Sequence, residues 1–200
     1  MNGMKKIILM AAVMLSSVAS FAQHATGSFT LQPKVGLNIA SLTNFDGADP
    51  RFGVAAGVEA EYQATDIFSI SAGVLYSMQG NKYDVATIGN KTATTTNKTD
   101  YINIPILANV YVVKGLAVKA GIQPGFKVND EVKYPFGDKS NSQDVDKAES
   151  FDFSIPVGLS YEFSNVVLDA RYNFGCTKVF KNADPKNSVF QITLGYKFDL

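Results

Sequence analysis

The sequence is poor in the side chains that carry most nucleophilic and metal chemistry. Its 200 residues include one cysteine and one histidine. The single cysteine, Cys176, cannot form an internal disulfide. A Ser–His nucleophile or a His/Cys metal site needs more of these residues than the chain provides. The one histidine, His24, precedes the first predicted strand, where we expect a disordered terminal residue. We therefore predict no enzyme activity and no cofactor.

Excess charge of one sign and long apolar runs are also missing. The 18 basic residues balance 18 acidic ones, so the formal net charge is zero and nothing indicates nucleic-acid binding. Beyond the N-terminus, no apolar run reaches the about 20 residues that a membrane helix needs. A helical membrane protein is therefore not expected.

The N-terminus has the composition of a targeting segment. Two lysines precede an apolar stretch over residues 7–15, and the triplet that ends at Ala22 fits the small-x-small cleavage rule. This pattern predicts a cleaved signal peptide over residues 1–22, and one exported domain over residues 23–200.

Alternating apolar and polar residues dominate the rest of the chain, which indicates strands with two different faces. Each alternating segment is about long enough for a tilted membrane strand of roughly 9–11 residues; the segments are 29–39, 52–63, 68–78, 102–112, 116–127, 151–163, 166–175 and 190–198. Tight links alternate with long polar ones, and the long ones are 42–50, 80–100, 129–150 and 176–187. The sequence therefore predicts an all-β fold, an eight-stranded antiparallel transmembrane β-barrel with an up-and-down meander. Short periplasmic turns and long outside loops then put both termini in the periplasm.

A membrane barrel and a soluble barrel differ in which face of their strands points into the barrel. A soluble lipocalin-like barrel holds its apolar residues inside around a ligand, whereas a membrane barrel turns them towards lipid. The polar face carries balanced charges that could pair in a narrow lumen: Lys34, Glu59, Glu61, Lys119, Lys127, Asp152, Glu162, Asp169, Arg171 and Lys197. Aromatic residues near the strand ends of the apolar face predict a girdle at the lipid boundary: Tyr62, Tyr76, Phe151, Phe163, Tyr172, Phe174, Phe190 and Phe198. We therefore favour the membrane barrel and keep the soluble ligand-binding barrel as the alternative.

Six strand motifs, taken in order, resemble one known family. They are Pro33–Asn38, Leu75–Gly80, Tyr101–Ile106, Val157–Glu162, Ala170–Gly175 and Leu194–Phe198. The set is similar to the outer-membrane β-barrel family common in Bacteroidota, which includes PorT-like proteins and small OmpX-like barrels. The resemblance implies an outer-membrane location and no single activity. The C-terminus departs from the usual barrel ending on an aromatic residue, because Asp199 and Leu200 follow Phe198.

Acidic residues leave two other kinds of site open. Glu59 and Glu61 lie on one face of a strand, roughly 7 Å apart, so they could form a paired-acid site or bind lumen lysines and Arg171. Asp144 and Asp146 in the acidic third loop could join a calcium site, although a solvated loop is the simpler interpretation.

Pro105 interrupts a predicted strand and indicates a bulge.

The long loops are where we expect function. Loops on a rigid scaffold commonly carry binding, which favours a barrel that presents four extracellular loops for structural or interaction roles. An accessory subunit of a secretion or uptake complex and a narrow channel remain alternatives. The expected partners are outer-membrane lipid, the barrel assembly machinery through the C-terminal strand, and an unidentified protein or surface ligand at the loops.

Overall fold

The computed structural model describes residues 24–43, 49–88, 91–136, 139–144, 148–179 and 184–200. The predicted signal peptide lies outside these residues. The described chain folds into one antiparallel sheet, whose strands are β1 (Phe29–Thr43), β2 (Asp49–Thr65), β3 (Phe68–Ile88), β4 (Lys91–Asn103), β5 (Ile106–Val113), β6 (Leu116–Phe136), β7 (Lys139–Asp144), β8 (Phe151–Phe163), β9 (Val166–Gly175), β10 (Lys186–Tyr196) and β11 (Phe198–Asp199). No helix among the described residues is long and apolar enough to cross a membrane.

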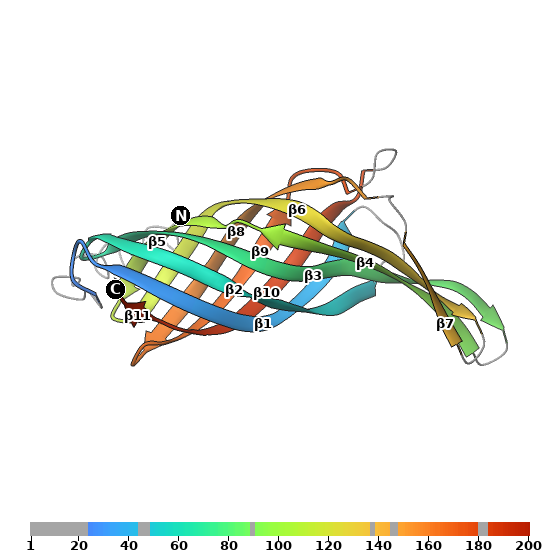
Figure 1. Ribbon diagram of the computed structural model, residues 1–200, viewed down its shortest axis with the longest axis horizontal. Helices are drawn as coiled ribbons and strands as arrows, with labels where there is room; N and C mark the ends of the chain where they lie inside the picture. Colours follow the sequence, from blue (N-terminus) through green and yellow to red (C-terminus); the bar gives the residue numbers. More distant parts are fainter. Residues whose placement is uncertain (1–23, 44–48, 89–90, 137–138, 145–147, 180–183) are drawn as a thin grey trace, which may run out of the picture.

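The sheet closes on itself into a barrel. Neighbouring strands pair in chain order, and β1 pairs with β10 from Lys34–Gly195 to Thr43–Lys186 and with β11 at Thr30 and Leu31. Two pairs of segments, β4 with β5 and β10 with β11, each form a single wall strand. The described residues therefore build a ring of eight strands, and the predicted fold class is confirmed (Figure 1).

The ring has two unlike ends. At one end, which we call the turn end, tight turns join β2 to β3, β5 to β6 and β8 to β9. Both ends of the described chain also lie there, because the amide of Leu200 donates to the carbonyl of Phe29 at 3.0 Å. The opposite end, the loop end, carries the longer connections. This asymmetry agrees with the predicted pattern of short and long links.

Pro105 interrupts the fourth wall strand, as its missing amide donor predicts. Ile104 and Pro105 lie between β4 and β5. The sheet stays connected there, because the Gly73 amide donates to the Pro105 carbonyl at 3.0 Å and the Ile104 amide donates to the Pro124 carbonyl at 2.8 Å.

Two segments predicted as loops are instead extensions of the sheet. The prediction of loops over 80–100 and 129–150 was wrong for most of their length. β3 and β4 stay paired from Gly80–Lys98 to Ile88–Lys91, and β6 pairs with β7 from Glu131–Asp144 to Phe136–Lys139. Threonine is abundant between positions 92 and 99, and its branched side chain favours strands. Strands β3, β4, β6 and β7 thus form what we call the projecting sheet, which extends past the ring at the right of Figure 1.

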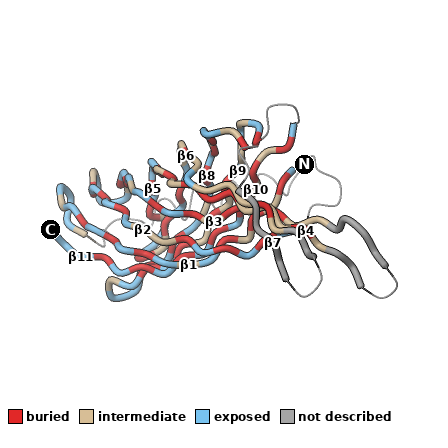
Figure 2. Tube along the Cα trace, turned by 45° about the vertical axis from the view of Figure 1, so that its right-hand side comes forward, coloured by how far each residue is buried: buried red, intermediate tan, exposed pale blue. Residues whose placement is uncertain are grey.

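The two faces of the wall have opposite character. Outward side chains such as Val35, Leu37 and Leu159 are more than half exposed, while inward ones such as Asn38, Glu59 and Asp169 are almost fully buried. Buried and exposed residues alternate along β1 and its neighbours (Figure 2). This is the reverse of a lipocalin-like barrel, which holds its apolar side chains inside.

Candidate functional site: the barrel interior and its two ends

Five charged side chains meet in the middle of the barrel, and we call them the central ion cluster: Lys34, Glu59, Lys119, Asp169 and Arg171. None is more than 4% exposed. The Glu59 carboxylate lies 3.0 Å from Lys34, 3.2 Å from Arg171 and 3.4 Å from Lys119. The Asp169 carboxylate lies 2.7 Å from Arg171 and 3.0 Å from Lys119. Each charge therefore has more than one partner of opposite sign, as a buried ion requires.

Glycine makes room for this cluster. Gly158 on β8 pairs across the sheet with Arg171 on β9 and with Lys119 on β6. A Cβ atom at Gly158 would lie 2.7 Å from the Cβ of Arg171, which is closer than real Cβ contacts. Because the Ala170 carbonyl oxygen would lie still closer to the same Cβ, a larger residue at Gly158 would force the neighbouring strand β9, which carries Arg171, to shift.

A second group of charges lies nearer the turn end. The ammonium of Lys197 lies 2.9 Å from Glu61 and 3.0 Å from Glu162. The hydroxyl of Tyr111 donates to the other oxygen of Glu61 at 2.5 Å. Lys197 also stands 5.8 Å from the centre of the Tyr111 ring, within the range of a cation–π contact.

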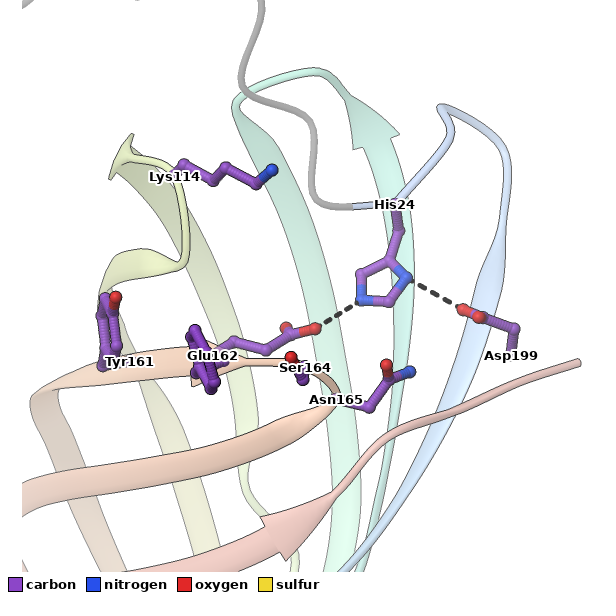
Figure 3. A pocket seen from close by; sticks show the side chains of 8 residues that line it. His24, Lys114, Tyr161, Glu162, Ser164, Asn165 and Asp199 are labelled. Atoms are coloured by element: carbon purple, nitrogen blue, oxygen red, sulfur yellow. Dashed lines mark hydrogen bonds and ion pairs between the residues drawn. The ribbon is translucent and has the colours of Figure 1, made fainter.

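His24 joins this group, which corrects the expectation of a disordered terminal residue. Its Nε2 lies 2.9 Å from a carboxylate oxygen of Glu162, and its Nδ1 lies 2.9 Å from one of Asp199 (Figure 3). The hydrogen bond to Glu162 raises the pKa of His24 above its usual value, more than burial lowers it. The alternation pattern could not show this contact, because His24 lies before the first strand.

A cavity of about 610 Å³ opens beside His24 at the turn end. Its lining comes from the β5–β6 turn (Lys114), the end of β8 (Tyr161, Glu162 and Phe163), the β8–β9 turn (Ser164 and Asn165) and the C-terminal strand (Asp199). Figure 3 shows the Glu162 and Asp199 carboxylates on opposite sides of the imidazole. Because both ring nitrogens already face carboxylates, this histidine has no free nitrogen to activate Ser164.

A third polar group lies at the loop end, and sequence reasoning missed it. Arg51 donates to the carbonyl of Gln79, and it lies 3.4 Å from Asp100. Asp100 also accepts from the Tyr76 hydroxyl at 2.9 Å and from the Asn129 amide at 3.2 Å. Arg51 comes one residue before the second predicted strand segment, so extending that alternation by one step could have found it.

The structure thus divides the predicted lumen network into separate groups. Two of its members lie apart from the others towards the loop end. Lys127 is only half-buried and lies 3.3 Å from Asp130. Asp152 is buried and accepts from the side chains of Asn187 at 2.9 Å and Thr177 at 3.3 Å.

The predicted girdle residues occupy two bands on the outer face. Tyr62, Phe163 and Phe198 lie near the turn end, and Tyr76, Phe151, Tyr172, Phe174 and Phe190 lie towards the loop end. All are exposed except Tyr172, which is half-exposed. Neighbouring rings contact one another, with centroids 4.7 Å apart for Phe29 and Tyr62 and 4.4 Å apart for Tyr172 and Phe174.

The geometry gives little support to a paired-acid site or to a calcium site. Glu59 is held by three cations, and Glu61 binds Lys197, Ser69 and Tyr111, so neither carboxylate faces the other as a catalytic pair. Asp144 is the register partner of Glu131 in the projecting sheet, and Asp146 lies outside the described residues. Across the described ranges, no three His, Cys, Asp or Glu side chains are grouped as metal ligands.

Comparison with solved structures shows the same architecture. Neisserial surface protein A superposes with a TM-score of 0.51 at 17% identity, covering 85% of this chain and 97% of that one. Ail, the attachment invasion locus protein of Yersinia pestis, in complex with the heparin analogue sucrose octasulfate, gives a TM-score of 0.50 at 12% identity, covering 87% of this chain and 100% of that one. At these identities the likeness concerns the fold. No curated protein sequence matches significantly.

A family model matches most of the chain. It describes an outer membrane protein β-barrel domain and covers residues 21–181. The closed ring, the apolar outer face and the charged interior are the features that such a domain needs in a bilayer. The chain therefore belongs to the family of outer membrane proteins with a β-barrel domain.

Proposed function

We propose that the protein is a surface-interaction barrel, anchored in the outer membrane with a closed lumen and with the projecting sheet outside the cell. The single observation that carries this proposal is the projecting sheet itself. Strands β3 and β6 are 21 residues each, about twice the length that a membrane strand needs. The extra length spans no membrane, so it serves a role beyond the bilayer.

An open strand edge supports a protein partner. Within the described residues, β7 pairs only with β6, which leaves its other edge unpaired. Unpaired edges are templates for strand addition by an extended segment of another chain. The names of two similar structures, a surface protein and an attachment invasion locus protein, accord with this role.

The charged interior of the ring argues against conduction as the main role. The central ion cluster lies across a ring of eight strands, which is just wide enough for side chains to fill. Because the cluster occupies the lumen, a narrow channel is the weaker alternative. The strand motifs accord further with the PorT-like, Bacteroidota-type branch, and an accessory role in a secretion or uptake complex would use the same projecting sheet.

The orientation has a direct test in the native cysteine. Cys176 is exposed and follows β9 at the loop end. If a signal peptide over residues 1–22 directs export and both termini are periplasmic, a membrane-impermeant maleimide should label Cys176 on intact cells. A Cys176→Ser variant is the matched control. Labelling that requires a permeabilised outer membrane would overturn this orientation.

The interaction role can be tested by photocrosslinking at the open edge. A benzophenone amino acid at Ser142 of β7 should give ultraviolet-dependent protein adducts on cells. The same probe at Leu159, on the lipid-facing wall, is the control and should give none. A shortened variant with a tight turn in place of residues 82–98 should still reach the outer membrane and fold. If Ser142 gives no adduct while the barrel is folded and correctly oriented, the surface-interaction proposal fails.

A further inference from the structure

The segment His24–Ser28, which we call the N-terminal strap, crosses the barrel mouth at the turn end. One side is bound to the end of β2, where the Gly27 amide donates to the Gln63 carbonyl at 2.7 Å, and to the β2–β3 turn, where the Thr26 hydroxyl donates to Asp66 at 2.8 Å. The other side is bound through His24 to Glu162 on β8 and Asp199 on β11. In the strand order, β8 lies on the far side of the ring from β2 and β3. The strap therefore bridges opposite walls.

The geometry of His24 favours its protonated form. Each ring nitrogen lies 2.9 Å from a carboxylate oxygen. An ionised carboxylate only accepts hydrogen bonds, and a neutral imidazole donates from one nitrogen alone. In the neutral form, the second nitrogen would point its lone pair at a carboxylate. With both carboxylates ionised, only the imidazolium donates to both Glu162 and Asp199, so this geometry favours protonated His24.

The charges around His24 favour the same state. Glu162 faces it from β8, Asp199 from β11, and Lys197 from the residue between β10 and β11, while Lys114 of the β5–β6 turn lines the adjoining cavity. Lys197 already neutralises one oxygen of Glu162 and one of Glu61. With His24 protonated, negative and positive groups alternate along this row.

We propose that the N-terminal strap is a pH-sensitive latch, closed by the His24 imidazolium and opened as that ring loses its proton. Deprotonation replaces one charge-assisted hydrogen bond with repulsion between the ring nitrogen and a carboxylate. The His24 side chain is 8% exposed and that of Glu162 is 3% exposed, so water screens this contact poorly. Asp199 is largely exposed, and its contact is therefore the weaker of the two.

The direction of the pH effect follows from the difference in the pKa of His24 between the folded and unfolded states. The hydrogen bond to Glu162 raises the pKa of His24 above the ordinary 6.5. A raised folded-state pKa gives a contribution that is fully present below the unfolded-state value and is lost as the pH rises through the folded-state value. The latch is therefore closed in acid and opens towards alkaline pH.

Opening separates His24 from Glu162 and Asp199 but leaves the central ion cluster in place. His24 is the strap residue that contacts Glu162 and lines the cavity of about 610 Å³ between the turns. The central ion cluster lies deeper, and it does not contact the strap through any described residue. Opening the latch therefore changes the part of the cavity wall that His24 forms, and conductance should not change with it.

The chain's single histidine allows a direct measurement of the latch. Protein extracted from outer membranes and labelled with ¹⁵N-histidine should show one ring, with both nitrogens protonated at pH 6.5 and a titration midpoint above that value. The Asp199→Asn variant should move the midpoint down. An Asp184→Asn variant, which removes an exposed partner of Lys178 at the loop end, should not move it. A neutral tautomer at pH 6.5, or a midpoint at or below 6.5, would overturn the proposal.

Hydrogen exchange at Gly27 tests whether protonation moves the strap. After correction for the intrinsic pH dependence of exchange, protection of the Gly27 amide should fall as the pH passes the His24 midpoint. In the His24→Ala variant it should be low at every pH, and in Asp199→Asn it should be lost at a lower pH than in the wild type. Heat-modifiable migration on gels shows that each variant still forms a barrel. Protection that stays constant with pH, or that survives in His24→Ala, would refute the latch.

Discussion

Removing the charge of Glu59 should destabilise the barrel more than any surface change of the same chemistry. Glutamine keeps the size of the side chain and removes its charge. In the wild type, that carboxylate neutralises Lys34, Arg171 and Lys119 at 3.0, 3.2 and 3.4 Å. The Glu59→Gln variant would leave these three cations facing Asp169 alone. Breaking a buried ion group from one side costs roughly 3–5 kcal/mol. At about 1.4 kcal/mol per factor of ten, the folding equilibrium constant should fall about a hundredfold to three-thousandfold.

Reversible urea unfolding in lipid vesicles measures this loss. Tryptophan is absent from the sequence, so tyrosine fluorescence or gel mobility reports the folded fraction, and linear extrapolation gives the free energy. Asp184→Asn is the control, because it removes a carboxylate whose partner Lys178 is also exposed; its unfolding midpoint should match the wild type. Adding Lys34→Met to Glu59→Gln removes one stranded cation, so the double variant should recover part of the loss.

A small loss of stability in Glu59→Gln would contradict a closed lumen. A loss below about 1 kcal/mol is the size expected for a solvent-exposed ion pair. If Glu59→Gln costs no more than that, water reaches and screens the central ion cluster, and the lumen is not closed. A double variant that is less stable than the single one would show that Lys34 has partners beyond the acids described.

Three further predictions test the wall and the lumen. Leu159→Arg places a charge on the lipid-facing wall, where Leu159 is 51% exposed, and it should cost about 2–4 kcal/mol near the bilayer midplane in the same unfolding assay. Gly158→Val should lower the unfolding midpoint, because even a Cβ at this position lies 2.7 Å from that of Arg171; an unchanged midpoint would show that the interior is not tightly packed. Purified protein in planar bilayers should give no stable conductance, and steady single-channel steps would contradict the side-chain-filled lumen.

The sequence predicts the wall of this barrel well, for a physical reason. Strand side chains alternate with a period of two, so one decision about the inner face places every residue of a strand. The outward position of Val35 and the inward positions of Lys34 and Arg171 follow from this choice of inner face. They can be predicted without knowing which strands pair. The closed ring also satisfies every strand edge, which leaves few other arrangements for eight amphipathic segments in lipid.

The parts that the sequence could not predict depend on distant pairing. The threonine-rich stretch from 92 to 99 is polar on both faces, so it lacks the alternation that reveals a strand, and its structure comes from pairing with β3 and β6. His24 finds Glu162 138 positions away and Asp199 175 positions away. A contact of such sequence separation leaves no local signal. The contacts of the N-terminal strap can be recognised only when the pairing register of the strands is known.

The strand register also shows that residues of the ring, and not of the projecting sheet, fill and close the lumen. Four members of the central ion cluster face glycine across the sheet: Lys34 pairs with Gly195 and Gly57, Glu59 with Gly73, and both Lys119 and Arg171 with Gly158. Asp169, the shorter acid, pairs with Ser160 and Thr193. Each long charged side chain thus has a small neighbour that leaves it space to cross the lumen. Because none of these residues lies in the extended parts of β3, β4, β6 or β7 beyond the ring, shortening the projecting sheet should leave the barrel closed. The proposed surface binding can then be tested separately from barrel stability.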